Sequence, residues 1–310
     1  MNMSTTVSSV FKLGKYTVNL LSVSNKNSAS VSPPPPKPLL VSTPSDEGEF
    51  PVLIFLHGTF LCNSFYSQLL QHISSHGYIV VAPQLYIVTG SDATKDISDA
   101  AEVTDWLVKG LVKILPNNVQ PNLCKLGIAG HSRGGKVAFA LALGYAKTSL
   151  TFSALLAVDP VDGTSKGNQT NPPILTYIPS SFELKMAALV IGSGLGEFKR
   201  NCLLPPCAPE GVSHQEFYDE CRAPACHLVA KEYGHMDTLD DDTKGIVGKA
   251  SYCLCAKGKT REPMRNFVGG VMVAFMRAYL NGDMEDLLTL KGDPDLAIPI
   301  GVSIASFQLE

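Results

Sequence analysis

The sequence predicts an α/β protein whose open, mostly parallel sheet is covered by helices on both faces. Short apolar runs alternate with segments of helical periodicity along most of the 310 residues. Some of these runs, such as residues 51–56, are almost entirely apolar, as is typical of parallel strands buried on both faces. Hydrophobic residues make up 45% of the chain and charged residues 17%, which supplies enough apolar surface for a large core. We predict one domain over residues 16–310.

The first 38 residues contain a single predicted strand, at 16–23, where apolar and polar side chains alternate. Residues 1–15 are polar, contain no acidic residue, and are predicted to be a short flexible N-terminus. Residues 24–38 are predicted to be a linker that ends in four prolines, which should be extended and exposed to solvent. Because no core-sized unit precedes it, this linker should join two strands of one sheet.

From residue 39 onward, strands and helices are predicted to alternate. Residues 96–115 carry apolar side chains at the spacing of one helix face. Residues 172–226 contain many prolines and few signals of regular structure beyond one strand, so we expect an irregular, lid-like loop region. The other predicted strands are 39–43, 51–56, 78–82, 123–129, 152–158, 187–192 and 227–230, and the other predicted helices are 63–75, 136–143 and 262–281, the last of which should close the domain.

A pentapeptide of the form Gly-x-Ser-x-Gly lies at residues 130–134, between a predicted strand and a predicted helix. This is the context of a nucleophile elbow, in which the serine takes a strained backbone conformation and the glycines leave room for the turn. The turn would lift Oγ of Ser132 clear of the sheet, at a helix N-terminus where free N–H groups stabilise an anion. Ser132 is therefore the candidate nucleophile; the alternative is an ordinary strand-to-helix turn.

A serine nucleophile needs an imidazole that accepts its proton and a carboxylate that orients the imidazole. In parallel sheets, functional groups gather beyond the carboxyl ends of the strands. Asp159 directly follows the strand at 152–158, and His235 follows the strand at 227–230. The order Ser132, Asp159, His235 is the one found in α/β-hydrolases. Among the other histidines, His131 lies inside the elbow and is expected to point away from the partners of the serine.

The carboxylate has two alternatives. Many hydrolases of this fold carry the acid after the strand that here ends near residue 192, but the first acidic residue there is Glu197, well into the loop. Asp162 lies three residues beyond Asp159, in a predicted turn. Asp159 is preferred because it follows its strand without a gap. The acidic residues at 237–242 are expected to form a solvated turn.

An oxyanion hole needs two backbone N–H groups. One should come from Arg133, the residue after the nucleophile, and the other from the loop after the strand at 51–56. Thr59 is the preferred donor in that loop, and Phe60 is the alternate.

The charge and composition exclude several classes of protein. The net charge of −3 and the lack of a basic block argue against a nucleic-acid partner. No apolar run approaches the roughly 20 residues that span a bilayer, so no transmembrane segment is predicted. Six of the eight cysteines lie in the C-terminal half without the spacing of a zinc site. We expect at least one disulfide there, with Cys207–Cys221 as the preferred pair, because a long loop gains most from a crosslink.

Five separated motifs, taken together, resemble the plant chlorophyllase family. The resemblance runs from about Phe11 to the predicted last helix, and it implies an α/β-hydrolase similar to cutinases and polyester-degrading esterases. It implies hydrolysis of the phytyl ester of chlorophyll by water, giving chlorophyllide and phytol, through the triad Ser132, Asp159 and His235 and without a cofactor or protein-bound metal. The motifs are Gly130-His-Ser-Arg-Gly-Gly135, Ser75-His-Gly-Tyr-Ile-Val-Val-Ala-Pro-Gln84, Asp159-Pro-Val161, Pro205-Pro-Cys-Ala-Pro209 and Tyr233-Gly-His-Met-Asp237.

Such a substrate would place the protein in the chloroplast and would favour peripheral association with a membrane. The cytosol is the alternative, because residues 1–15 are short for a transit peptide. A pocket for an apolar chain is expected beside the oxyanion loop, with lining residues Phe60, Leu61, Phe65 and Tyr66. These aromatic residues would equally suit the core. Two other functions stay open: a general carboxylesterase or cutinase-like lipid esterase, and a non-catalytic small-molecule binder on the same fold.

Overall fold

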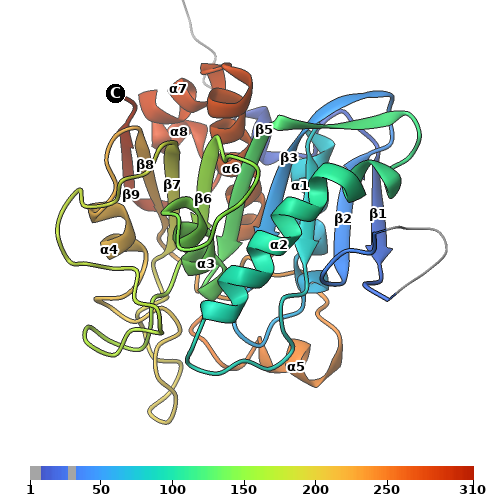
Figure 1. Cartoon of the computed structure of the whole chain (residues 1–310). Coiled ribbons are helices and arrows are strands. Elements are labelled where there is room, and N and C mark those ends of the chain that lie inside the picture. The colour runs from blue at the N-terminus through green and yellow to red at the C-terminus, as the bar shows by residue number, and fades with distance from the viewer. Residues whose placement is uncertain (1–7, 27–32) are drawn as a thin grey trace, which may run out of the picture.

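The computed structural model describes residues 8–26 and 33–310, in which nine strands form one sheet in the order β1-β2-β4-β3-β5-β6-β7-β8-β9 (Figure 1). Strands β3 to β8 run parallel to one another, whereas the pairs β1 with β2, β2 with β4, and β8 with β9 are antiparallel. The predicted open, mostly parallel sheet is confirmed. The strands are β1 Val18–Val23, β2 Leu39–Pro44, β3 Gly48–Leu56, β4 Ile79–Pro83, β5 Val119–His131, β6 Ala154–Val158, β7 Ala187–Ser193, β8 Ala225–Ala230 and β9 Val302–Gln308.

Helices cover both faces of this sheet, as the sequence predicts. On one face, α1 (Ser67–Ser75) and α6 (Glu262–Asn281) pack on a core that includes Leu53 and Phe55 of β3. On the other face, α2 (Thr94–Gly110) and α3 (Arg133–Ala142) pack on a core that includes Val52 and Ile54. Successive residues of β3 thus serve opposite cores, because side chains alternate along a strand. This burial on both faces explains the continuous apolar run.

The N-terminal segment differs from its prediction. Residues 8–15 are not a flexible tail, because Val10 and Phe11 are buried in the same core as α1 and α6, and a short 3-10 helix, Ser9–Phe11, contains both. His72 of α1 fixes this segment through a 2.8 Å contact between its Nε2 atom and the carbonyl oxygen of Val10. Residues 1–7 of the predicted tail lie outside the described residues.

The predicted linker lies between β1 and β2, which are neighbouring antiparallel strands of the sheet. Its proline segment is less exposed than expected, since Pro35 is buried. The indole N–H of Trp106 on α2 donates a 2.9 Å hydrogen bond to the carbonyl oxygen of Pro33. The proline segment therefore contacts α2 at Trp106. Residues 27–32 of the linker lie outside the described part of the chain.

The helix at 262–281 is α6, but it does not close the domain. Two helices and the edge strand β9 follow it, and β9 pairs with β8. The two helices are short, and β9 has the mixed sequence VSIASFQ, so none of the three gives a clear periodic signal. The short helices that the sequence did not predict are α4 His214–Asp219, α5 Gly245–Ala250, α7 Glu285–Gly292 and α8 Pro294–Ala297.

Candidate active site

A sharp turn at Ser132 joins β5 to α3. Ser132 has φ 56° and ψ −125°, a conformation that is rare for a residue with a side chain. A Cβ atom on Gly130 would stand 2.2 Å from the carbonyl oxygen of Gly134, and a Cβ on Gly134 would stand 2.2 Å from that of Leu56. Both positions therefore require glycine, as the elbow interpretation predicts. Because α3 begins at Arg133, Ser132 lies at the N-terminus of that helix.

Asp159 and His235 meet beyond the carboxyl ends of β6 and β8. Nδ1 of His235 lies 2.7 Å from Oδ2 of Asp159, and both side chains are buried. Ser132 and His235 line the same cavity. The structure therefore brings together the three residues that the sequence predicts, each from a different strand end.

Ser193, the last residue of β7, supports Asp159 as well. Its hydroxyl donates to Oδ2 of Asp159, and its backbone N–H donates to Oδ1 at 3.2 Å. Burial acts to raise the pKa of Asp159, but the hydrogen bond and charge of His235, the charge of His214 and the Ser193 hydroxyl outweigh it and lower this pKa to about 2. Asp159 is thus an ionised carboxylate at neutral pH. Sequence reasoning missed Ser193, although the rule that strand ends carry functional groups applies to it directly.

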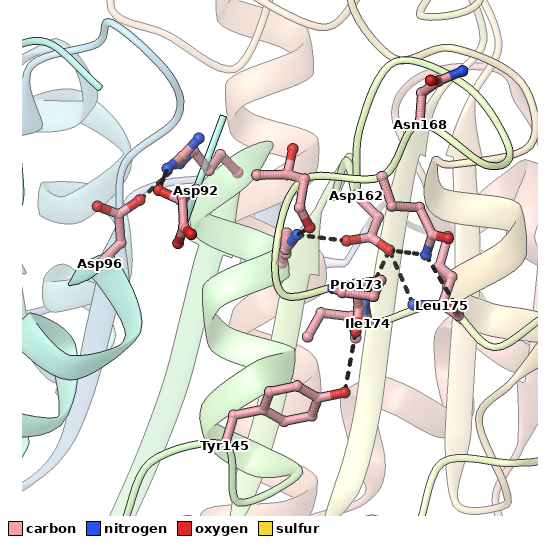
Figure 2. A network of polar contacts seen from close by, with 12 residues as sticks. Asp92, Asp96, Tyr145, Asp162, Asn168, Pro173, Ile174 and Leu175 are labelled. Atoms are coloured by element: carbon pink, nitrogen blue, oxygen red, sulfur yellow. Dashed lines mark hydrogen bonds and ion pairs between the residues drawn. The ribbon is translucent and has the colours of Figure 1, made fainter. Parts of the chain in front are cut away.

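The two alternative carboxylates have other surroundings. Asp162 is fully buried, and its Oδ1 atom forms a 2.7 Å ion pair with Nζ of Lys136 on α3. Its Oδ2 atom accepts hydrogen bonds from the amide of Gln169 and from the backbone N–H groups of Ile174 and Leu175 (Figure 2). Glu197 is exposed on the loop after β7. Asp162 therefore anchors the loop after β6 and does not contact His235.

His131 does not point away from the partners of the serine, as was expected. Its ring centroid lies 4.5 Å from that of His235, and its Nε2 atom lies 2.9 Å from the carbonyl oxygen of His235. Its Nδ1 atom lies 2.8 Å from the hydroxyl of Tyr66. Since both ring nitrogens are engaged, His131 fixes the position of the loop that carries His235. The sequence gives only its place on β5, not the direction of its ring.

The expected solvated turn at residues 237–242 is buried in part. Asp237 accepts hydrogen bonds from the backbone N–H groups of Gly234 and Gly258, and Asp240 accepts one from the N–H of Gln68. Asp241 and Asp242 are exposed, as expected. The two buried carboxylates therefore hold the loop of His235 in place.

Arg133 is the expected N–H donor after the nucleophile, and its side chain makes further contacts. Its guanidinium donates to Oδ2 of Asp96 at 2.7 Å and to the carbonyl oxygen of Asp92 (Figure 2). It also donates to the carbonyl oxygen of Gly90, so it ties the loop after β4 to the elbow. The loop after β3 reaches the elbow too, because a Cβ on Gly58 would stand 3.1 Å from Cβ of Ser132. The N–H donors expected at Arg133 and Thr59 thus belong to segments that meet at Ser132.

A cavity of about 470 Å³ opens above Ser132 and His235, and its lining is mostly apolar. Phe60 and Leu61 line it, as predicted. Phe65 and Tyr66 do not: both are buried in the core, and the Tyr66 hydroxyl accepts a hydrogen bond from the N–H of Gly58. Both residues lie at the end of the short 3-10 helix Asn63–Tyr66, which precedes α1, and the ring of Tyr66 packs against Phe55 of β3. The other lining residues are Thr59, Val161, Thr164, Leu204, Pro205, Pro206, Cys207, Met236, Val247, Ser251 and Leu254.

The loops after β7 and β8 are joined by a disulfide between Cys207 and Cys255. A disulfide in the C-terminal half was predicted, but the preferred pair Cys207–Cys221 is wrong. Cys221 is a free, buried cysteine two residues after α4, and its thiol donates to the carbonyl oxygen of Phe217. The spacing along the chain cannot show that two separate loops meet over one cavity. Nowhere in residues 8–26 and 33–310 do three or more His, Cys, Asp or Glu side chains cluster so that they could hold a metal ion.

We expect the free energy of unfolding to fall steeply as the pH drops from about 6.5 to about 4. Burial lowers the pKa of His57 and His72 to about 4, and burial together with His235 lowers that of His131 to about 3. Burial and the neighbouring His214 lower the pKa of His227 to about 3. In this range the unfolded chain binds protons that the folded chain does not, so the stability contributed by the neutral rings is complete above about pH 6.5 and is lost below it.

Each such proton changes the free energy of unfolding by about 1.4 kcal/mol per pH unit. Urea denaturation at a series of pH values measures this slope. The variant His72→Gln should show a slope that is smaller by one proton. Equal urea midpoints at about pH 6.5 and about pH 5 would contradict the buried neutral histidines.

The nine-stranded sheet and the strand-end positions of Ser132, Asp159 and His235 define an α/β-hydrolase. A family model described as Chlorophyllase matches residues 6–308. The chain is 54% identical to Chlorophyllase-2 of Arabidopsis thaliana, over 94% of this chain and 95% of that protein. It is 47% identical to Chlorophyllase-1 of Arabidopsis thaliana, over 85% and 82%, and 44% identical to "Chlorophyllase-1, chloroplastic" of Citrus unshiu, over 93% and 85%. The chain belongs to the chlorophyllase family. Among the helices of its described residues, none is long and apolar enough to cross a bilayer.

Proposed function

We propose that this protein hydrolyses the phytyl ester of chlorophyll, giving chlorophyllide and phytol, with Ser132, His235 and Asp159 as its catalytic triad. Membership of the chlorophyllase family supports the reaction. The observation that carries the assignment of residues is the 2.7 Å contact between His235 and Asp159 beside a cavity that Ser132 also lines. The chain thereby acts as a carboxylic ester hydrolase, and its substrates are chlorophyll and water.

In this mechanism, Ser132 attacks the carbonyl carbon of the propionate ester. His235 accepts the serine proton and returns it to the departing phytol oxygen, while Asp159 orients the ring and stabilises its cation. The backbone N–H groups of Arg133 and Thr59 stabilise the tetrahedral oxyanion at the N-terminus of α3. Water, deprotonated by His235, then attacks the acyl-enzyme, releases chlorophyllide and restores Ser132. No step requires a bound metal or cofactor; the magnesium of chlorophyll belongs to the substrate.

The site of action follows from the substrate and from the relatives. The Citrus unshiu and Citrus sinensis relatives are named chloroplastic, and we place this protein in the chloroplast. A substrate with a phytyl tail resides in lipid, so we propose that the enzyme associates peripherally with a membrane and takes the ester from it.

One assay panel tests the function. The purified protein is incubated with chlorophyll a, short p-nitrophenyl esters and a triglyceride, and phytol, nitrophenol and fatty acid are measured. We expect release of phytol, with chlorophyll a preferred over triglyceride, because the apolar cavity suits a single long chain. Rapid cleavage of the nitrophenyl esters without any release of phytol would favour the general esterase instead. Binding of chlorophyll without cleavage of any ester would favour a non-catalytic binder.

A further inference from the structure

The most exposed apolar side chains gather at the end of the molecule that holds the candidate active site. Among the described residues, the four most exposed large hydrophobic side chains are Ile246, Leu203, Ile87 and Val88, at 89%, 88%, 78% and 77% exposure. Ile87 and Val88 follow β4, Leu203 follows β7, and Ile246 follows β8. Because β3 to β8 are parallel, these loops leave the same edge of the sheet as Ser132 does. α5, which contains Ile246, lies at the end of the molecule opposite to α7 (Figure 1).

This exposed apolar surface continues into the cavity. Val247 and Leu254 follow Ile246, and Leu204 follows Leu203; all three line the cavity that Ser132 and His235 share. Val247 and Leu254 are themselves 47% and 42% exposed, so each reaches both the cavity and the outer surface. A ligand that covers Ile246 and Leu203 would therefore lie at the entrance to the candidate site.

Within the two loops that carry these side chains, the segments nearest to them carry positive charge, while Glu197, Glu210, Asp241 and Asp242 are exposed at the ends of these segments. Residues 243–261 contain no acidic residue, and Lys244, Lys249, Lys257 and Lys259 are exposed among them. Residues 198–209 also contain no acidic residue, and they carry the exposed Lys199 and Arg200. This arrangement contrasts with the net charge of −3 for the whole chain. The edge thus combines protruding apolar side chains with positive charge.

We propose that residues 198–204 and 244–254 form a docking surface for an anionic lipid bilayer, which holds the cavity of Ser132 against the membrane. Exposed aliphatic side chains enter the boundary between headgroups and acyl chains, while lysines beside them are attracted to anionic headgroups. A second copy of the chain is a poorer occupant, because it would bring like-charged loops together. The proposal rests on the proposed function and names the surface through which an ester with an apolar tail passes from lipid into the cavity without crossing water.

The test separates binding from catalysis. In the Ser132→Ala background, which prevents hydrolysis of any lipid ester, flotation with vesicles of phosphatidylcholine is compared with flotation with phosphatidylcholine mixed with phosphatidylglycerol. We expect binding to the mixed vesicles. The double variant Lys244→Glu/Lys249→Glu should weaken it by about tenfold or more, and Ile246→Ser with Leu203→Ser by a similar factor. Leu288→Ser on α7, half exposed at the opposite end, is the matched control and should bind as its parent does.

Catalysis gives the second readout. With Ser132 present, Ile246→Ser with Leu203→Ser should cleave a soluble p-nitrophenyl ester at the parent rate, since neither side chain lines the cavity. The same protein should hydrolyse vesicle-embedded chlorophyll more slowly. Equal binding of all variants to the mixed vesicles, or no binding by the parent, would overturn the docking surface and leave the esterase function untouched. Normal vesicle binding without hydrolysis of any ester by the wild type would overturn the function and leave the surface standing.

Discussion

The variant Ser132→Ala is expected to lose about 10⁵-fold or more of kcat on every ester that the wild type cleaves. The hydroxyl is the proposed nucleophile. Without it, water would have to attack the ester directly, and help from His235 and the oxyanion donors does not make that attack comparably fast. The fold should be unchanged, because the methyl group fits the same space and, within residues 8–26 and 33–310, the Ser132 hydroxyl makes no hydrogen bond that the fold would lose. Initial rates on chlorophyll a and on a p-nitrophenyl ester measure the loss.

Two controls make this result specific. Ser251 also lines the cavity, but its hydroxyl accepts from Arg261 and donates to the carbonyl oxygen of Gly248. Ser251→Ala should keep kcat within about tenfold of the wild type. An organophosphonate should label the wild type at Ser132 and should not label Ser132→Ala. Activity of Ser132→Ala close to that of the wild type would remove Ser132 from the mechanism.

The second large effect is expected from Asp159→Asn, which should lower kcat by roughly 10³–10⁴. Oδ2 of Asp159 lies 2.7 Å from Nδ1 of His235, and an amide at this position would favour the wrong imidazole tautomer. The KM should change little, because Asp159 is buried behind His235 and does not line the cavity. Steady-state kinetics on the soluble ester measures both quantities.

Asp162→Asn is the matched control, and the structure adds an expected loss of stability in this variant. From the sequence, Asp162 is a turn carboxylate without a catalytic partner, so its loss should change kcat little. In the structure, Asp162 forms a fully buried ion pair with Lys136. Its loss should lower the free energy of unfolding by about 3–5 kcal/mol, because a buried lysine is left without its counter-ion. The folded fraction should keep its kcat. Equal losses of kcat in both variants, or a larger one in Glu197→Gln, would show that Asp159 is not the catalytic acid.

Much of the fold could be predicted because its signals are local. The apolar runs of β3 to β8 are buried on both faces, and the glycines at 130 and 134 follow from the tight turn at Ser132. The sequence could suggest the three proposed catalytic residues because each follows a strand, and the ends of parallel strands share one edge. That argument needs only the order of the elements.

The remaining features depend on contacts between distant segments. The pairing of Cys207 with Cys255 requires that two loops meet over the cavity, which no spacing along the chain reveals. The inward direction of Tyr66, the contact of His131 with His235 and the burial of Asp162 depend likewise on packing around each side chain. β9 was missed because an edge strand half exposed to solvent needs little apolar sequence.

The first turn of α3 has a consequence for the electric field at the nucleophile. Arg133 and Lys136 place two cations at a helix end that is already positive, yet Asp96 and Asp162 neutralise both of them. The attraction for a developing oxyanion therefore comes from backbone N–H groups, which carry no titratable proton. The proposed oxyanion hole should therefore keep its strength at every pH at which the sheet stays folded.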